Sequence, residues 1–264
     1  MKFVERFSAS AQIILWILTL AAVLAGCSPA PDSALPGSKR EQTELADRLL
    51  RASPNVIAAD PDLLAYMTAT AEEAVAGHCA SCHGANLQGQ VGVPNLVDVD
   101  WLWEITGYEM TSVEPVMALQ QTILYGVRNT ACAEEIKQYG GCPDTRFSEM
   151  PGYGIDRFSP EQVDDLTAYV LSLSTPVEDD EAVARGRSLW PVCTECHGAE
   201  GYGDKSFGGP DLTDAVWLYG GEREQIHDVI FNGRRGYCPP WADVLPPASI
   251  KALAVYIYRQ ASRF

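Results

Sequence analysis

The chain has 264 residues, of which 47% are apolar and 20% are charged. This composition is typical of a folded protein, and the length allows one or two domains that each bury a hydrophobic core. Nineteen Lys and Arg against 35 Asp and Glu give a formal net charge of −16. This acidic balance disfavours an electrostatic grip on phosphate backbones or anionic lipid surfaces, so nucleic acid is excluded as a partner.

Residues 1–27 have the layout of an export signal. Lys2 and Arg6 precede an apolar run over residues 13–24, and small residues follow before Cys27. The sequence LAGC that ends in Cys27 resembles the bacterial lipoprotein box, in which the cysteine is lipidated and begins the mature chain. The alternative is an uncleaved single-span anchor, because residues 7–26 barely reach the roughly 20 residues that a bilayer requires. Both interpretations place the remaining chain on the periplasmic side of a bacterial membrane.

Residues 28–55 are predicted to form a tether, because Ser, Pro, Ala and charged residues dominate the beginning of this stretch. Prolines at positions 29, 31 and 36 interrupt any regular element there. A short helix is predicted over residues 41–51.

The rest of the chain contains two copies of one pattern. Each copy opens with CxxCHG, continues through a proline and a Trp-Leu pair, passes an arginine, and closes on an amphipathic segment at helical spacing. The matching segments are residues 79–84 and 193–198, 94–103 and 210–219, 122–128 and 229–235, and the closing helices 159–174 and 246–262. Two domains are therefore expected, over residues 56–176 and 177–264.

The CxxCH spacing fits covalent haem attachment. Two thiols three residues apart on a helical turn add to the two haem vinyl groups, and the following histidine is held beneath the iron as its proximal ligand. A zinc half-site or a redox pair is the alternative, but neither repeat supplies the second Cys or His pair that would close a zinc site. We therefore predict two covalently bound haems c. Their attachment residues are Cys79, Cys82 and His83 for the first and Cys193, Cys196 and His197 for the second.

The second repeat makes the sequence resemble a known family. Residues 208–221 (GGPDLTDAVWLYGG), 232–236 (NGRRG) and 251–258 (KALAVYIY) are similar to the dihaem CcoP or FixP subunit of cbb3-type cytochrome c oxidases. The resemblance implies an all-α protein of two tandem class I cytochrome c domains. It also implies an electron relay from a periplasmic donor, such as a small cytochrome c, to haem-copper oxidase subunits.

Three features depart from that family. Cys27 stands where the family uses spanning helices, and residues 103–150 form a longer excursion than expected. The Met-Pro motif of the second domain reads Cys238-Pro239 here.

The distal haem ligands follow from this comparison. Met150 precedes Pro151 and the closing helix of its repeat, which is where the fold places the distal ligand, so we expect it on the first haem. The second domain has no methionine, and Cys238 occupies the matching position. A thiolate is a competent iron ligand. His227 and a five-coordinate iron remain the alternatives.

Four further residues recur at matching places in the two repeats: Trp101, Trp217, Arg128 and Arg235. Their N–H groups are candidates for contact with haem propionates, and core packing or solvent exposure is the alternative. Cys132 and Cys142 lie in the first-domain insertion and are expected to form a disulfide, with two free thiols as the alternative.

The leading functional hypothesis is an electron-transfer protein, either a non-catalytic oxidase subunit or a free anchored shuttle. The second is a dihaem periplasmic oxidoreductase with a His/Cys-ligated haem, similar to thiosulfate dehydrogenase. No catalytic residue is assigned, because nothing else in the sequence supplies a substrate pocket.

Overall fold

The computed structural model describes the chain from residue 35 onward, and its regular secondary structure there is helical. The described residues are 35, 37–103, 113–130, 142, 144–154, 156–176 and 180–262. The longer helices are α2 (Lys39–Arg51), α3 (Pro54–Ala59), α4 (Pro61–Ala74), α6 (Val113–Tyr125), α8 (Pro160–Ser174), α9 (Asp180–Leu189), α11 (Arg223–Asn232) and α12 (Pro247–Ser262). Within these ranges, β pairing is limited to isolated bridges. The all-α expectation is confirmed.

Both predicted closing helices form, as α8 and α12. Ser159 begins α8 with a capping box, in which its side chain accepts from the backbone of Gln162 and the Gln162 side chain accepts from Ser159 N–H. Pro160 follows in the first turn, where its missing N–H costs nothing. The apolar stripes predicted from the sequence are buried, including Leu166 and Leu253 at 1% exposure each.

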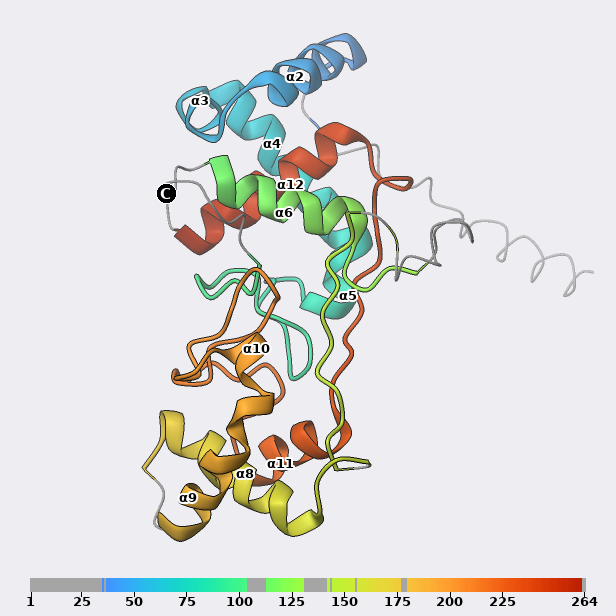
Figure 1. Cartoon of the computed structure of the whole chain (residues 1–264). Helices are drawn as coiled ribbons and strands as arrows, with labels where there is room; N and C mark the ends of the chain where they lie inside the picture. The colour runs from blue at the N-terminus through green and yellow to red at the C-terminus, as the bar shows by residue number, and fades with distance from the viewer. Residues whose placement is uncertain are drawn as a thin grey trace, which may run out of the picture. The chain divides into compact units, whose positions relative to one another are not determined.

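One hydrophobic core gathers α2, α3, α4, α6 and α12 (Figure 1). Leu49 of α2 and Ile57 of α3 are fully buried in it, together with Leu253 of α12. The helix predicted over residues 41–51 is therefore present, and it packs against α4 and α12. The folded part of the chain thus extends into the stretch predicted as a tether.

A second core gathers α8, α9 and α11 around Trp190. Val163 and Leu166 of α8 are buried there beside Ile226 and Ile230 of α11. A bidentate ion pair links α8 to α9, because Arg185 donates from Nε and Nη2 to the two carboxylate oxygens of Asp165 at 2.9 and 2.8 Å.

The two cores do not follow the two repeats. The first haem motif belongs to the core that contains α12, the closing helix of the second repeat. The second haem motif belongs to the core that contains α8, the closing helix of the first repeat. The predicted domains 56–176 and 177–264 remain a division of the sequence. In the structure, the core beside each haem motif contains the closing helix of the other repeat.

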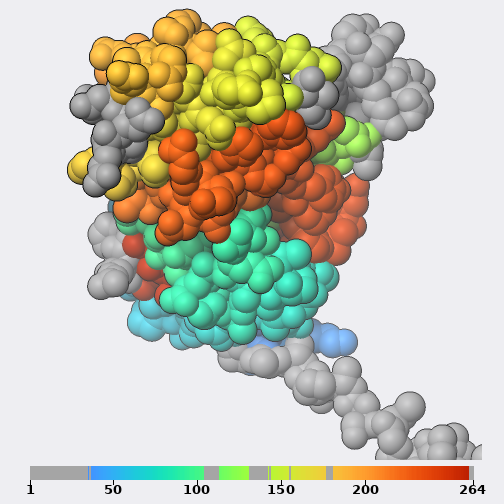
Figure 2. Space-filling model, turned by 90° about the horizontal axis from the view of Figure 1, so that it is seen from below, coloured from blue at the N-terminus to red at the C-terminus, as the bar shows by residue number. Residues whose placement is uncertain are grey.

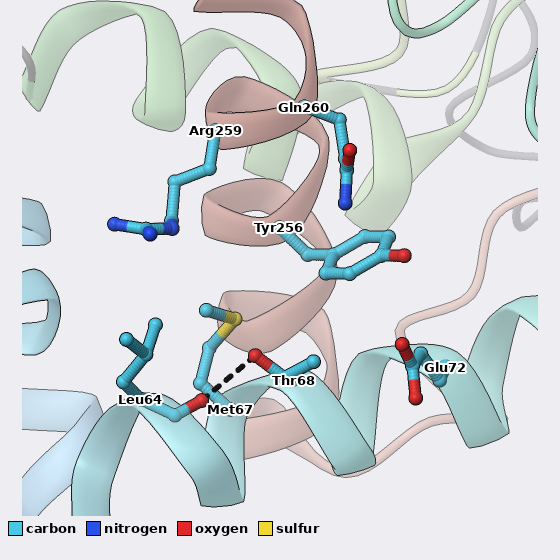
Figure 3. A pocket seen from close by; sticks show the side chains of 7 residues that line it. All are labelled: Leu64, Met67, Thr68, Glu72, Tyr256, Arg259 and Gln260. Carbon is cyan, nitrogen blue, oxygen red and sulfur yellow. Dashed lines mark hydrogen bonds between the residues drawn. The ribbon is translucent and has the colours of Figure 1, made fainter. Parts of the chain in front are cut away.

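A surface groove runs between α4 and α12. Figure 3 shows its lining: Leu64, Met67, Thr68, Glu72, Tyr256, Arg259 and Gln260. Thr68 Oγ1 donates to the Leu64 carbonyl at 2.8 Å, so this hydroxyl is satisfied within α4. Met67 is fully buried in the first core, where it packs rather than serving as a free thioether.

Among the described residues, no helix combines the length and apolarity that a membrane crossing requires. The predicted signal or anchor over residues 1–27, including Cys27, lies outside them.

Candidate functional site

Each CxxCH motif lies on a short helix that follows an irregular turn. A π-helical turn (Val75–Cys79) leads into α5 (Ala80–His83) in the first repeat. A 3-10 turn (Trp190–Val192) leads into α10 (Thr194–His197) in the second. The two cysteines of each motif are therefore separated by one helical turn, as double attachment to a haem requires. A π-helical turn is often found at functional sites, but the sequence pattern did not predict this one.

The two proximal histidines are held in the same way. His83 Nδ1 lies 3.0 Å from the Pro94 carbonyl, and His197 Nδ1 lies 3.0 Å from the Pro210 carbonyl. A carbonyl only accepts, so each contact places the ring proton on Nδ1 and leaves Nε2 as the unprotonated nitrogen. Burial lowers the pKa of His197, which further favours the neutral ring that binds iron. Both sites thus present an imidazole ready for axial ligation.

A buried orphan donor supports the fit of a haem to the first site. Trp101 Nε1 is buried and has no hydrogen-bond partner in the structure. A buried N–H without an acceptor is costly, and a haem propionate is an acceptor of the right chemistry. Trp101 packs against the first core and lies 5.9 Å from Tyr258, ring centre to ring centre. Trp217 is half-buried against the second core. Propionate contact by either tryptophan remains a prediction.

The two repeat arginines are engaged with protein groups. Arg128 donates from Nε to the Gly236 carbonyl and from Nη1 to the Ser148 carbonyl. Arg235 Nε lies 3.2 Å from a carboxylate oxygen of Glu149, and both side chains are exposed. Their propionate contacts remain predictions, and the structure adds a role for Arg128 in joining two distant segments.

Arg146 is a candidate that the sequence reasoning missed. Its guanidinium lies over the Trp103 ring at 5.4 Å, and its Nε and Nη2 are buried without partners. Burial also lowers the pKa of Arg146. Two buried donors of a half-buried cation favour an anionic acceptor, and a haem propionate would provide one. The comparison of the two repeats did not single out Arg146, because this residue lies in the first-domain insertion, which has no counterpart in the second repeat.

Cys238 lies near Cys79 and Cys82 of the first haem motif. Its backbone pairs with Val127 through two hydrogen bonds of 2.9 and 3.3 Å. Burial, with a smaller contribution from the nearby Cys79 and Cys82 thiols, raises the pKa of the Cys238 thiol to about 11. Three residues along, the Trp241 ring contacts His78 with 5.1 Å between ring centres.

Met150 is half-buried and packs against the second core, the core that contains Tyr153 and Cys193. His227, the alternative distal ligand, contacts Phe231 and Asp164. Its ring stacks on Phe231 at 5.9 Å, and its Nε2 lies 3.6 Å from Asp164 on α8. In this position His227 packs between α8 and the end of its own helix.

Cys142 is disulfide-bonded in the structure. Its predicted partner, Cys132, lies outside the described residues, so the pairing of the two remains a prediction.

The loops that follow the two haem motifs touch each other. Gly92 N–H donates to the Leu218 carbonyl at 2.7 Å. Figure 2 shows this surface, where the teal loop of the first repeat lies against the orange residues of the second. The loops that follow the two attachment sites are therefore in direct contact.

Comparison with known proteins agrees with this geometry. A cytochrome c family model matches residues 68–174, and the model of the cbb3-type cytochrome c oxidase subunit III matches residues 181–257. These matches and the two CxxCH sites define the class: a c-type cytochrome with two cytochrome c domains and two covalently bound haems.

The chain also has close curated relatives. It is 35% identical over 216 residues to the cbb3-type cytochrome c oxidase subunit CcoP of Cereibacter sphaeroides, covering 81% of this chain and 68% of that protein. It is 37% identical over 213 residues to the FixP subunit of Bradyrhizobium sp. strain ORS 278, covering 80% and 67%. The chain belongs to this CcoP/FixP family of cbb3-type oxidase subunits.

Proposed function

We propose that this protein passes electrons through its two haems from a periplasmic donor to the haem-copper subunits of a cbb3-type cytochrome c oxidase. The observation that carries this proposal is the similarity to CcoP and FixP over about four fifths of the chain, across both haem motifs. The matched His83 and His197 contacts support it, since both sites present the same free imidazole nitrogen.

The chain's own residues prepare each site for electron transfer. A haem c supplies one-electron redox chemistry when it is bound. The carbonyls of Pro94 and Pro210 hold the proton on Nδ1 of each histidine and so fix the ring's orientation. The hydrogen bond between Gly92 and Leu218 keeps the two haem loops in contact. Fixed ligands and adjacent loops limit the structural change that accompanies each transfer.

The anchor is proposed to be a lipid on Cys27, with a single span over residues 7–26 as the alternative. The LAGC sequence, which ends in Cys27, supports the lipid anchor. Intact mass of detergent-extracted protein distinguishes the two. A chain that begins at a diacylated Cys27 supports the lipid anchor, and a chain that retains Met1 contradicts it.

Purification from its native membrane tests the oxidase assignment. We expect the protein to co-elute with haem b and copper, which the haem-copper subunits carry, and to lose that association in detergents that dissociate the oxidase. A His197→Ala variant is the matched control, because it alters one haem site and leaves the anchor intact. A protein that elutes free of copper and oxidises thiosulfate would support the oxidoreductase hypothesis instead.

A further inference from the structure

Arg146 carries a pair of buried donors that matches one carboxylate. Its Nε and Nη2 have no hydrogen-bond partner among the described residues. These two nitrogens lie side by side on one edge of the planar guanidinium, so together they fit the two oxygens of a single carboxylate. The chain uses this geometry elsewhere, because Nε and Nη2 of Arg185 donate to the two carboxylate oxygens of Asp165 at 2.9 and 2.8 Å. Arg146 therefore presents the same bidentate edge without its acceptor.

The backbone of Arg146 is fixed beside the first haem motif. Its N–H donates to the Gly126 carbonyl at 3.2 Å, and its carbonyl accepts from Arg128 N–H at 2.7 Å. Val127, which lies between these two residues in the chain, pairs with Cys238. The Cys238 thiol in turn lies near both cysteines of the first haem motif. One short extended segment thus separates Arg146 from the loop that approaches the first attachment site.

The side chain of Arg146 lies at the junction of the two haem loops, residues 84–103 and 198–219. Its guanidinium carbon is 5.4 Å from the centre of the Trp103 ring, at the end of the first haem loop. That ring packs on Gly208 of the second haem loop, where a Cβ would meet it at 2.2 Å. A Cβ at the neighbouring Gly209 would lie 1.8 Å from the Cys196 carbonyl. Trp103 therefore connects the guanidinium to the second haem motif.

Other arginines of this region already use their donors. Arg128 donates to two backbone carbonyls, and Arg234 and Arg235 each contact an acidic side chain. Among the described residues, the buried side-chain nitrogens without a partner belong to Arg146 and to Trp101 of the first haem loop. Both residues come from segments that adjoin the first haem motif. A haem carries two propionates, so a single haem can supply an acceptor to each of them.

We propose that the Nε–Nη2 edge of Arg146 holds one propionate of the haem attached at Cys79 and Cys82, and that this ion pair raises the reduction potential of both haems. The inference rests on the two attached haems of the proposed function. It gives Arg146 a role in tuning the haems, through a charge that is placed where the two haem loops meet.

The direction of the effect follows from charge. Reduction removes one positive charge from a haem iron, so a nearby cation favours the ferrous form and raises the potential. The interaction weakens with distance, and a buried charge is screened less than an exposed one. The haem whose propionate is held by Arg146 should therefore depend on this charge most. The second haem should respond in the same direction and by a smaller amount.

Redox titration of Arg146→Gln and Arg146→Lys tests the proposal. We expect Arg146→Gln to disfavour reduction of the first haem about tenfold, which is about 59 mV for a one-electron couple. The potential of the second haem should fall by less. Arg146→Lys keeps the charge but loses the bidentate edge, so it should lower the first potential by less than Arg146→Gln does.

A spectroscopic tag assigns the two potentials. In a Cys79→Ala background, the first haem stays attached through Cys82 and keeps one vinyl group, whose conjugation shifts its absorption band to longer wavelength. Titration of the shifted band then reports the first haem alone. Adding Arg146→Gln to this background should lower the potential of the shifted band more than that of the unshifted band. A larger fall in the unshifted band would overturn the assignment of the propionate to the first haem.

Arg48→Gln is the matched control for the loss of charge. Arg48 is paired with Asp60 on the surface of the first core, so its removal takes away one cation outside both haem loops. We expect both potentials to stay at the wild-type values in this variant. Equal shifts in Arg48→Gln and Arg146→Gln would overturn the proposal, because net charge alone would then explain them. Unchanged potentials in Arg146→Gln, or a fall in Arg146→Lys as large as in Arg146→Gln, would overturn it as well.

Mass spectrometry separates this inference from the proposed function. A protein that carries two attached haems, with potentials that do not depend on Arg146, would overturn the inference alone. A wild-type protein that attaches fewer than two haems would contradict the proposed electron relay, and the role of Arg146 with it.

Discussion

The backbone of Gly126 lies directly against the backbone of residues 238–240. Its φ is +73°, and a Cβ would lie 2.4 Å from the Cys238 carbonyl and 2.9 Å from the Pro240 nitrogen. We expect Gly126→Ala to lower the free energy of unfolding by about 1–3 kcal/mol, because both the backbone conformation and the contact become strained. Thermal unfolding measures this loss, and if Cys238 ligates a haem the spectrum of that haem should change with it.

Gly77→Ala is the control for that substitution. Gly77 lies in the π-helical turn before Cys79, and a Cβ there would meet no atom within 4 Å. Alanine also favours helical conformations over glycine, so stability should stay level or rise slightly. Equal losses in the two variants would show that the approach of Gly126 to Cys238 is unimportant.

At the scale of single residues, the sequence predicted which residues attach the haems. It did not predict the contacts that surround those residues. The CxxCH spacing identified His83 and His197, because attachment is a local property of five residues. The contact between His78 and Trp241 joins residues 163 positions apart, and no local pattern encodes it. The orphan donors of Arg146 were missed for a similar reason, since their burial depends on Trp103 and the surrounding fold.

Among the helices, the ion pair between Asp165 and Arg185 joins α8 to α9. The hydrogen bonds from Arg185 lower the pKa of Asp165 below its ordinary value of 3.8. A depressed carboxyl pKa contributes stability that is present above the unfolded-state pKa and is lost as the pH falls through the folded-state pKa. We therefore expect Asp165→Asn to cost at most about 1 kcal/mol at pH 7 and a smaller amount at about pH 3, because the contribution is lost as the pH falls.

Denaturant unfolding at both pH values checks this difference. Glu181→Gln is the control, because Glu181 lies 3.9 Å from the same guanidinium and is 91% exposed. It should cost less than Asp165→Asn at neutral pH. A cost for Asp165→Asn that is unchanged in acid would mean that packing, rather than ionisation, is responsible.

The exchanged closing helices make a second prediction at this scale. Leu253→Ala in α12 and Leu166→Ala in α8 each remove a side chain at 1% exposure, so each should cost about 2–5 kcal/mol. Leu253→Ala should weaken distal ligation at the haem held by His83, and Leu166→Ala at the haem held by His197. Spectra of the two variants at sub-denaturing temperature test this. Perturbation of the haem within the same repeat would contradict the exchanged cores.

The exchange could not be predicted from the sequence, although both helices could. Their periodicity and caps are local, so α8 and α12 were predicted nearly to the residue. The choice of partner is different, because the two repeats offer similar apolar faces to either helix. That choice depends on long-range contacts, such as the pairing of Val127 with Cys238 and of Met150 with Arg234.

Across the whole molecule, the formal charge of −16 governs the encounter with an electron donor. An acidic protein attracts a basic partner over about one Debye length, roughly 8 Å at physiological ionic strength. We expect the rate of reduction by a basic cytochrome c to fall steeply as salt rises, because screening removes this attraction. An acidic donor of similar potential is the control, and its rate should rise or stay level as repulsion is screened. Stopped-flow reduction across an ionic-strength series measures both. A rate with the basic donor that stays flat over the series would mean that docking depends on apolar contact rather than on charge.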